Sequence, residues 1–165
     1  MTERVFIALG SNLDDRLSYL QSGLDDLQSM PGLVIERVSR VYETAPQGYT
    51  EQPVFLNAVC CGWTEQSPSE LLAAIQEIER RHGRQRIVHW GPRTLDLDLL
   101  LFGAVCSPEP ALTLPHPYIG ERDFVLVPLV EIAPEIRNPI TQQPYADDLK
   151  RLNSCELPAV AQLRL

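Results

Sequence analysis

The stretch from Thr94 to Phe102 constrains the fold more than any other part of the chain. Its leucines alternate with Asp96 and Asp98 before an apolar run, which predicts a buried strand. Because side chains alternate across a strand, both carboxylates lie on one face, with their Cα atoms roughly 6–7 Å apart. Two neighbouring carboxylates at the edge of an apolar core repel each other and lose water, and a divalent cation relieves both costs. Oxygen ligands favour a hard ion such as Mg²⁺. The alternative to a metal site is that one aspartate caps a turn and the other pairs with an arginine.

A cluster of arginines stands directly upstream of this strand. Five arginines lie between residues 80 and 93, in a chain whose formal net charge is −8. Cations beside a carboxylate pair suit phosphoryl transfer, because that reaction depends mainly on positioning and charge neutralisation. Trp90 adds a flat surface on which a planar ring can stack. Two alternatives stay open: Arg80 and Arg81 are solvated charges at a helix end, and the other arginines form a structural network with the aspartates.

The order of the predicted elements indicates an α+β fold. We expect strands over residues 4–9, 33–43, 54–63 and 94–102, and helices over 13–27 and 68–82. This order is the ferredoxin-like βαββαβ sandwich, a mostly antiparallel sheet with both helices on one face. A phase break within 33–43 indicates a bulge. Helices over 122–132 and 145–152 and a loose end follow, and the tail from about residue 138 carries the weakest signals.

Local signals mark where the helices begin. Residues 10–12 predict a strand-to-helix turn with a capping asparagine, since neither common glycine-rich phosphate-binding motif is present. Asp14 and Asp15 suit the first turn of the first helix. Ser67 and Glu70 predict a capping box for the second helix. One buried stripe of the first helix is predicted by leucines at helical spacing: Leu13, Leu17, Leu20, Leu24 and Leu27.

Length and composition predict one globular domain. A chain of 165 residues is long enough to bury a core. None of its apolar runs approaches the length of about 18 residues that a membrane-spanning helix needs. Its four cysteines have no C-x-x-C spacing, which favours free thiols in a reducing cytoplasm. The net charge of −8 argues against a nucleic-acid binder. We therefore expect a cytoplasmic protein that binds neither nucleic acid nor membrane.

Three polar residues each have two interpretations. Asn57, on the inward face of its strand, either ties down the backbone or reads a ligand. Glu79 borders the buried face of its helix near the carboxyl end, so it either pairs with an arginine or serves a binding site. His116, held between two prolines, is either structural or a ligand-binding residue. The loop over 44–53 has the length of a binding loop.

The segment Trp90–Asp98, with the sequence WGPRTLDLD, resembles the signature of the 6-hydroxymethyl-7,8-dihydropterin pyrophosphokinases of folate synthesis. Further similar segments lie in register along the chain: 8–13, 42–44, 55–58, 77–79, 83–84, 114–117 and 127–134. The resemblance implies a ferredoxin-like fold in a single domain over residues 1–165. It also implies transfer of pyrophosphate from ATP to the hydroxymethyl group of the pterin, with release of AMP. We expect a monomer.

The resemblance further implies roles for individual residues. Asp96 and Asp98 would hold two Mg²⁺ ions that bridge the ATP phosphates, and Arg84 and Arg93 would steady the transferring group, so these four would be catalytic. Together with the two arginines, the ATP site would be lined by Glu79, Arg86, Thr113, His116 and Arg122. The pterin pocket would be formed by Thr44, Ala45, Pro46, Phe55, Asn57, Trp90 and Phe124.

Three positions depart from the family pattern. Tyr118 and Asp123 stand where the family often has arginines, and both changes remove positive charge near the expected ATP phosphates. Phe55 stands where a tyrosine is sometimes found, which costs at most one hydrogen bond.

Two functions of other classes remain as alternatives. A ferredoxin-like module without activity would bind ATP and release no AMP. A metal-dependent phosphohydrolase would release phosphate without any pterin.

Overall fold

The computed structural model describes residues 2–13, 15–44, 54–83, 94–152 and 157–165. These residues form a six-stranded sheet with the strand order β5-β1-β4-β3-β6, in which β2 also pairs with β4. Every one of these pairings is antiparallel. The strands are β1 (Glu3–Ser11), β2 (Leu33–Val38), β3 (Arg40–Thr44), β4 (Phe55–Thr64), β5 (Asp96–Phe102) and β6 (Ala159–Gln162).

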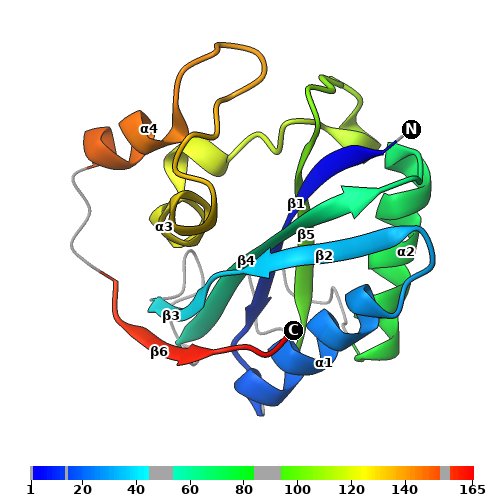
Figure 1. The fold of residues 1–165 in the computed structure, drawn as a ribbon. Helices are drawn as coiled ribbons and strands as arrows, with labels where there is room; N and C mark the ends of the chain where they lie inside the picture. Colours follow the sequence, from blue (N-terminus) through cyan, green and yellow to red (C-terminus); the bar gives the residue numbers. More distant parts are fainter. Residues whose placement is uncertain (1, 14, 45–53, 84–93, 153–156) are drawn as a thin grey trace.

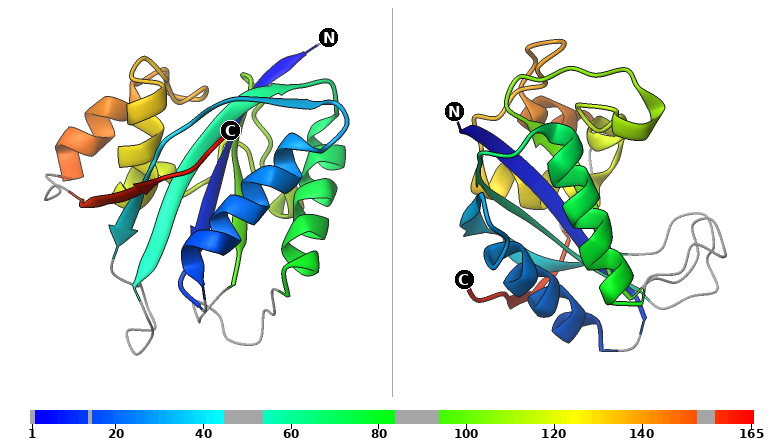
Figure 2. Two further views of the ribbon diagram at one scale, coloured as in Figure 1. Left: turned by 60° about the horizontal axis from the view of Figure 1, so that its bottom comes forward. Right: turned by 90° about the vertical axis from the view of Figure 1, so that its right-hand side faces the viewer.

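Helices cover both faces of this sheet. They are α1 (Arg16–Gln28), α2 (Pro68–Arg81), α3 (Asp123–Ile132) and α4 (Tyr145–Leu152). Figure 1 gives their positions, and Figure 2 shows α1 and α2 together on one side of the sheet, with α3 and α4 on the other. Each side has its own core: Leu24, Ile75 and Leu97 belong to the first, and Val59 and Leu126 to the second. The predicted ferredoxin-like arrangement of the first two helices is therefore confirmed, and the later helices form an additional layer.

The start of α1 differs from the prediction. The helix begins at Arg16, and its cap is Asp15, whose Oδ1 accepts the Ser18 N–H at 3.3 Å. The prediction that Asn12 caps this helix is therefore wrong, because Asp15 takes the cap position. The prediction that Asp15 lies within the first turn is wrong for the same reason. Leu17 is 41% exposed and lines a surface cleft, so the buried stripe is narrower than predicted. By contrast, the capping box of Ser67 and Glu70 at the start of α2 is confirmed.

The single strand predicted over 33–43 is divided at Ser39 into β2 and β3. The Ser39 Oγ accepts the Val59 N–H at 2.9 Å and donates to the Arg40 carbonyl at 2.8 Å. A side-chain hydroxyl thus replaces one rung of the backbone ladder, and this interrupts the strand. The expected bulge is present nearby, as a register shift between Ile35 and Arg37.

The prediction of a loose carboxyl-terminal end is wrong, because β6 joins the sheet. It pairs with β3, with Arg40 opposite Gln162 and Val41 opposite Ala161. Without β6, strand β3 would present an unpaired edge. A four-residue strand has too few positions to show a two-residue period, which explains why the sequence did not reveal it. The strand predicted from Thr94 likewise begins two residues later, at Asp96.

No helix in the described ranges is long and apolar enough to cross a membrane. Among the cysteines, Cys60, Cys61 and Cys106 are free thiols, and Cys155 lies outside the described residues.

Candidate active site

The end of β1 and the starts of β4 and β5 bring several predicted site residues together. Gly10 lies opposite Asn57 on β4 and opposite Asp96 on β5, so the three residues form one row across three strands. Asp98 lies opposite Ala8, on the next row of this face. Directly opposed residues in antiparallel strands share a face, so Asn57 and the two carboxylates project to the same side of the sheet. This is the side covered by α3.

Small residues on β1 leave room between the amide and the carboxylates. A Cβ on Gly10 would lie 3.0 Å from Oδ1 of Asn57 and 3.9 Å from Cβ of Asp96. A larger side chain would therefore displace the Asn57 amide. The prediction of a turn at Gly10 does not include this role. The available signal was an alanine and a glycine at alternate positions of an apolar strand, Ala8 and Gly10.

Asn57 is held by a neighbouring strand. The residue is 9% exposed, and its Nδ2 donates to Oγ1 of Thr44 at 2.6 Å. Thr44 is the last residue of β3 and lies opposite Phe55 in the β3–β4 register. The structure thus places three residues predicted for the pterin pocket side by side. Phe124, in the first turn of α3, is half-buried against the second core.

Glu79 approaches the aspartate strand from α2. The residue is 3% exposed, and its Oε2 accepts the backbone N–H of Leu97 at 2.9 Å. Leu97 stands between Asp96 and Asp98, and β5 is an edge strand of the sheet. The carboxylate therefore binds a backbone donor that the sheet itself leaves unpaired, and it fixes the part of β5 that carries both aspartates.

A cleft of about 310 Å³ lies beside β5 and α2. Its volume falls in the range of small-molecule sites, about 300–1,000 Å³. It brings together four residues predicted for the ATP site or the metal site: Glu79, Asp98, Thr113 and His116.

His116 is docked on the outer side of β5. Its backbone N–H donates to the Leu100 carbonyl at 2.9 Å, and its Nδ1 accepts the Tyr118 N–H at 3.2 Å. Burial, together with the nearby Arg122 guanidinium, lowers the pKa of His116 to about 4. At pH 7 the ring is therefore neutral, and its proton is on Nε2 because Nδ1 is an acceptor. This nitrogen is a donor suited to an anionic oxygen.

Two residues that depart from the family pattern lie around Arg122. The Arg122 guanidinium carbon lies 4.8 Å from the ring centroid of Tyr118 and 5.7 Å from that of Phe124. Tyr118 therefore contributes a cation–π contact to a residue predicted for the ATP site. Asp123 stands in the first turn of α3, where a negative charge is favourable for the helix dipole.

Several predicted residues lie outside the described residues: Ala45, Pro46, Arg84, Arg86, Trp90 and Arg93. They belong to the segments 45–53, which joins β3 to β4, and 84–93, which joins α2 to β5. At the ends of the second segment, the Thr94 hydroxyl donates to the His82 carbonyl at 2.9 Å. The end of α2 and the start of β5 therefore lie next to each other, close to Asp96.

The donor set suits a hard divalent ion. Asp96 and Asp98 are partly exposed and offer carboxylate oxygens from one strand face. Within the described ranges there is no group of three or more histidine, cysteine, aspartate or glutamate side chains that could hold a metal. Magnesium commonly uses one or two carboxylates and completes its shell with water and substrate phosphates, so this pair fits Mg²⁺.

Comparison with known families agrees with this geometry. A model of the 7,8-dihydro-6-hydroxymethylpterin-pyrophosphokinase family matches residues 6–134, which include every described candidate site residue. The chain belongs to this family. The pyrophosphokinase resembles the 2-amino-4-hydroxy-6-hydroxymethyldihydropteridine pyrophosphokinase of Pseudomonas aeruginosa, with 44% identity over 139 residues, covering 84% of this chain and 86% of the relative. The corresponding Bacillus subtilis protein is 43% identical over 141 residues, covering 86% of this chain and 84% of the relative.

In other relatives the matching region is part of a longer chain. The folic acid synthesis protein fol1 of Schizosaccharomyces pombe is 40% identical over 149 residues, which are 90% of this chain and 20% of that protein. The crystal structure of wild-type Plasmodium falciparum HPPK-DHPS superimposes with a TM-score of 0.72 at 14% identity, covering 92% of this chain. The pyrophosphokinase spans 45% of that chain. At this identity the likeness shows the fold alone, and it confirms the predicted ferredoxin-like class.

Proposed function

We propose that this pyrophosphokinase transfers the pyrophosphoryl group of ATP to the hydroxymethyl group of 6-hydroxymethyl-7,8-dihydropterin, releasing AMP, in folate biosynthesis. The observation that carries the proposal is the row Asn57–Gly10–Asp96 across three adjacent strands. This row places the Asn57 amide, which can hydrogen-bond to a heterocycle, beside the Asp96 and Asp98 carboxylates, which can bind a metal–phosphate complex. Family membership supports the reaction class.

The pterin would bind on the Asn57 side of the row. A pterin edge carries alternating donors and acceptors, and an asparagine amide offers one of each kind. The Thr44 hydroxyl accepts one N–H of that amide, and this fixes the orientation of the Asn57 side chain. Phe55 and Phe124 would pack against the flat ring, as would Trp90, with Ala45 and Pro46 adding backbone contacts.

The nucleotide would occupy the cleft beside β5. Glu79, Thr113 and His116 line or border it, and the neutral His116 ring can donate from Nε2 to a phosphate oxygen. Arg122 would add a positive charge, and so would Arg86. These assignments follow from the family motif and from the shared location of the described residues.

Asp96 and Asp98 would hold two Mg²⁺ ions. When bound, the ions would neutralise phosphate charge and polarise the phosphoryl oxygens. The chain itself positions the reactants: the Glu79–Leu97 hydrogen bond fixes the strand that carries the aspartates. Arg84 and Arg93 would stabilise the charge on the transferring and leaving groups as the pterin hydroxyl attacks the β-phosphorus in line. The loops that carry these arginines would exclude water from the reaction.

We further propose that residues 1–165 form a single cytoplasmic domain that acts as a monomer and binds no nucleic acid. The supporting observations are the net charge of −8 and the free thiols of Cys60, Cys61 and Cys106.

The test is incubation with MgATP and the hydroxymethyl dihydropterin, followed by measurement of AMP. We expect AMP to form only when the pterin is present, and not when EDTA removes the divalent cation. Phosphate released from ATP without pterin would instead indicate a phosphohydrolase. ATP binding without AMP formation would indicate an inactive nucleotide-binding module.

A further inference from the structure

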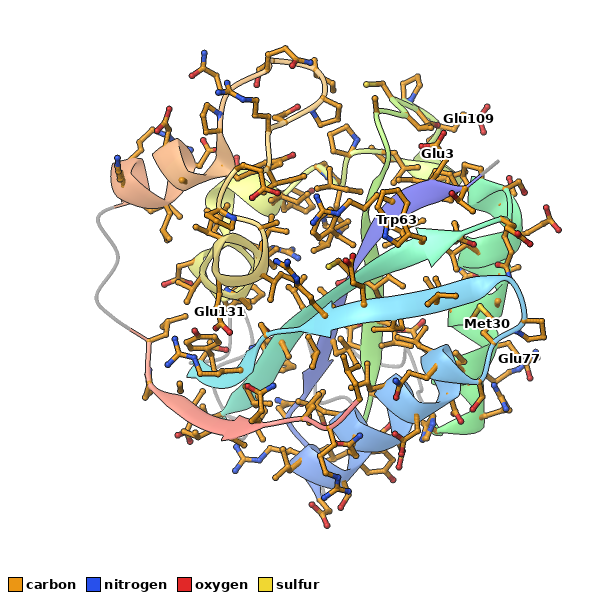
Figure 3. All side chains as sticks on the ribbon, in the orientation of Figure 1. Glu3, Met30, Trp63, Glu77, Glu109 and Glu131 are labelled. Carbon is orange, nitrogen blue, oxygen red and sulfur yellow. The ribbon has the colours of Figure 1, made fainter. Side chains whose placement is uncertain are left out.

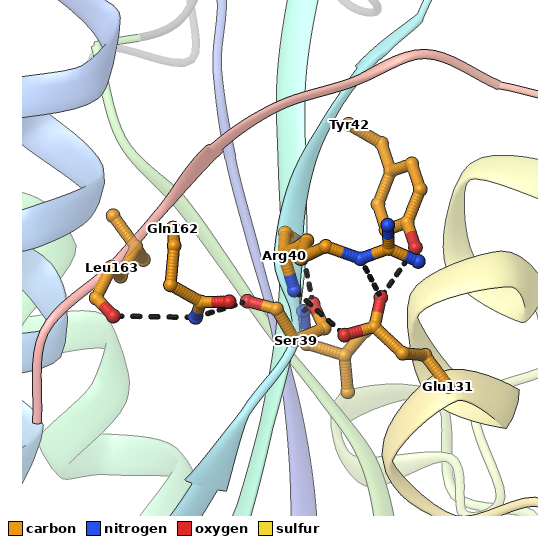
Figure 4. Close-up of polar contacts among 7 residues, drawn as sticks. Ser39, Arg40, Tyr42, Glu131, Gln162 and Leu163 are labelled. Atoms are coloured by element: carbon orange, nitrogen blue, oxygen red, sulfur yellow. Dashed lines mark hydrogen bonds and ion pairs between the residues drawn. The ribbon is translucent and has the colours of Figure 1, made fainter.

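A single carboxylate on α3 binds strand β3 through three donors, a cluster we term the Glu131 bridge (Glu131, Arg40 and Tyr42). Oε2 of Glu131 accepts the Arg40 backbone N–H at 3.0 Å, and Oε1 accepts the Arg40 Nε–H at 3.3 Å. The Tyr42 hydroxyl also donates to Oε1. Figure 4 shows the three contacts, and Figure 3 shows Glu131 reaching from α3 toward β3.

The Glu131 bridge is partly shielded from water. Tyr42 is 4% exposed, and the Glu131 side chain is 25% exposed. Burial of the Tyr42 phenol and its hydrogen bond to Glu131 raise the pKa of Tyr42. The phenol therefore stays protonated at neutral pH and acts as a donor. A charge-assisted hydrogen bond in partly desolvated surroundings is stronger than an exposed one, so the contact can hold β3 in place.

The position of Tyr42 connects the Glu131 bridge to the proposed pterin pocket. Tyr42 lies directly opposite Asn57 in the β3–β4 register, and Thr44 lies two residues further along β3. These three side chains share one face of the sheet. The Thr44 hydroxyl, in turn, accepts the Asn57 amide N–H at 2.6 Å. A shift of β3 along β4 would therefore move the hydroxyl that orients the Asn57 amide.

We propose that Glu131 and Tyr42 are positioning residues for the pterin substrate: by holding β3 against α3, they set the Thr44 hydroxyl that orients the Asn57 amide. The inference rests on the proposed pterin role of Asn57 and Thr44. Neither Glu131 nor Tyr42 belongs to the residues predicted from the sequence for the pterin or ATP sites. The Glu131 bridge acts on one substrate only, because the nucleotide cleft lies beside β5, with β1 and β4 between it and β3.

A second contact at the same end of α3 supplies a matched control. Arg37 on β2 donates from its guanidinium to the Ile132 carbonyl at 3.1 Å. This contact also joins the last turn of α3 to the sheet, but β2 carries none of the proposed site residues. Loss of the Arg37 contact removes one link between α3 and the sheet but keeps all three Glu131 contacts, so Thr44 should stay in place.

The experiment measures steady-state kinetics with each substrate varied in turn, for Y42F, E131Q, the double variant and R37A. We expect about a tenfold higher KM for the pterin in E131Q and a smaller rise in Y42F, with kcat and the KM for ATP within about twofold of wild type. The double variant should lose no more than E131Q, because the Tyr42 contact is one of the three that E131Q already weakens. R37A should leave the KM for the pterin unchanged, whatever its effect on melting temperature.

Three results would overturn the inference: an unchanged KM for the pterin in Y42F and E131Q, an equal rise in the KM for both substrates, or an R37A variant that matches E131Q. N57A separates this inference from the proposed function. If N57A raises the KM for the pterin and the Glu131 bridge variants do not, only the positioning role is lost. If N57A has no effect either, the proposed pterin pocket itself is wrong.

Discussion

Replacement of His116 by glutamine should remove a specific part of the pH dependence of stability. The folded protein holds His116 neutral, because burial and the Arg122 guanidinium lower the pKa of its ring from the ordinary 6.5 to about 4. Between these two pH values the unfolded chain binds a proton that the folded protein does not. Proton uptake at His116 therefore leaves stability unchanged well above pH 6.5, and it lowers stability progressively as the pH falls through 6.5 toward 4.

The size of the effect follows from the two pKa values. Linkage gives a loss of about 2 kcal/mol in the free energy of unfolding between pH 7 and pH 5 from this residue alone. H116Q cannot titrate, so its free energy of unfolding should fall by about 2 kcal/mol less than that of the wild type over the same interval. The packing cost of the substitution is present at both pH values and cancels in this difference.

The measurement is urea unfolding followed by far-UV circular dichroism at pH 5, 6 and 7, without nucleotide and with EDTA present. H116N serves as a second non-titrating variant of different shape, and it should show the same reduced pH dependence. If the wild type and both variants lose equal stability between pH 7 and pH 5, the attributed burial of His116 and its proximity to Arg122 would be contradicted.

Four further predictions concern the proposed site. Asp98→Ala should abolish AMP formation while pterin binding, measured by calorimetry without nucleotide, changes little; lost pterin binding would argue against a metal role. Gly10→Ala, whose new Cβ would meet Asn57 Oδ1 at 3.0 Å, should raise the KM for the pterin and cost about 1–3 kcal/mol of stability, and an unchanged KM would contradict the proposed row. Glu79→Ala should destabilise the protein by about 1–3 kcal/mol in urea unfolding, because the Leu97 N–H loses its partner, and a neutral result would refute that account. Arg84→Ala should lower kcat more than it weakens binding of either substrate, whereas equal losses would contradict a role in the transition state.

Much of the site could be predicted from the sequence because the patterns that indicate it span only a few residues. The alternation of leucine with Asp96 and Asp98 specifies a shared strand face, whatever the rest of the chain does. The two interpretations of Asn57 and Glu79 could not be separated in this way. Asn57 bonds to Thr44, 13 residues away, and Glu79 to Leu97, 18 residues away, and such pairings depend on how helices and strands pack.

The sequence by itself determined the elements whose causes lie within a few residues: the capping box that begins α2, the strand that carries the aspartates, and the order that indicates a ferredoxin-like fold. Only the tertiary structure decided that Ser39 divides a strand, that β6 covers the edge of β3, and that Glu131 reaches β3 from α3. The physical reason is range. Periodicity and capping act between near neighbours, whereas these contacts join residues 20 to more than 100 positions apart, which only the packed chain brings together.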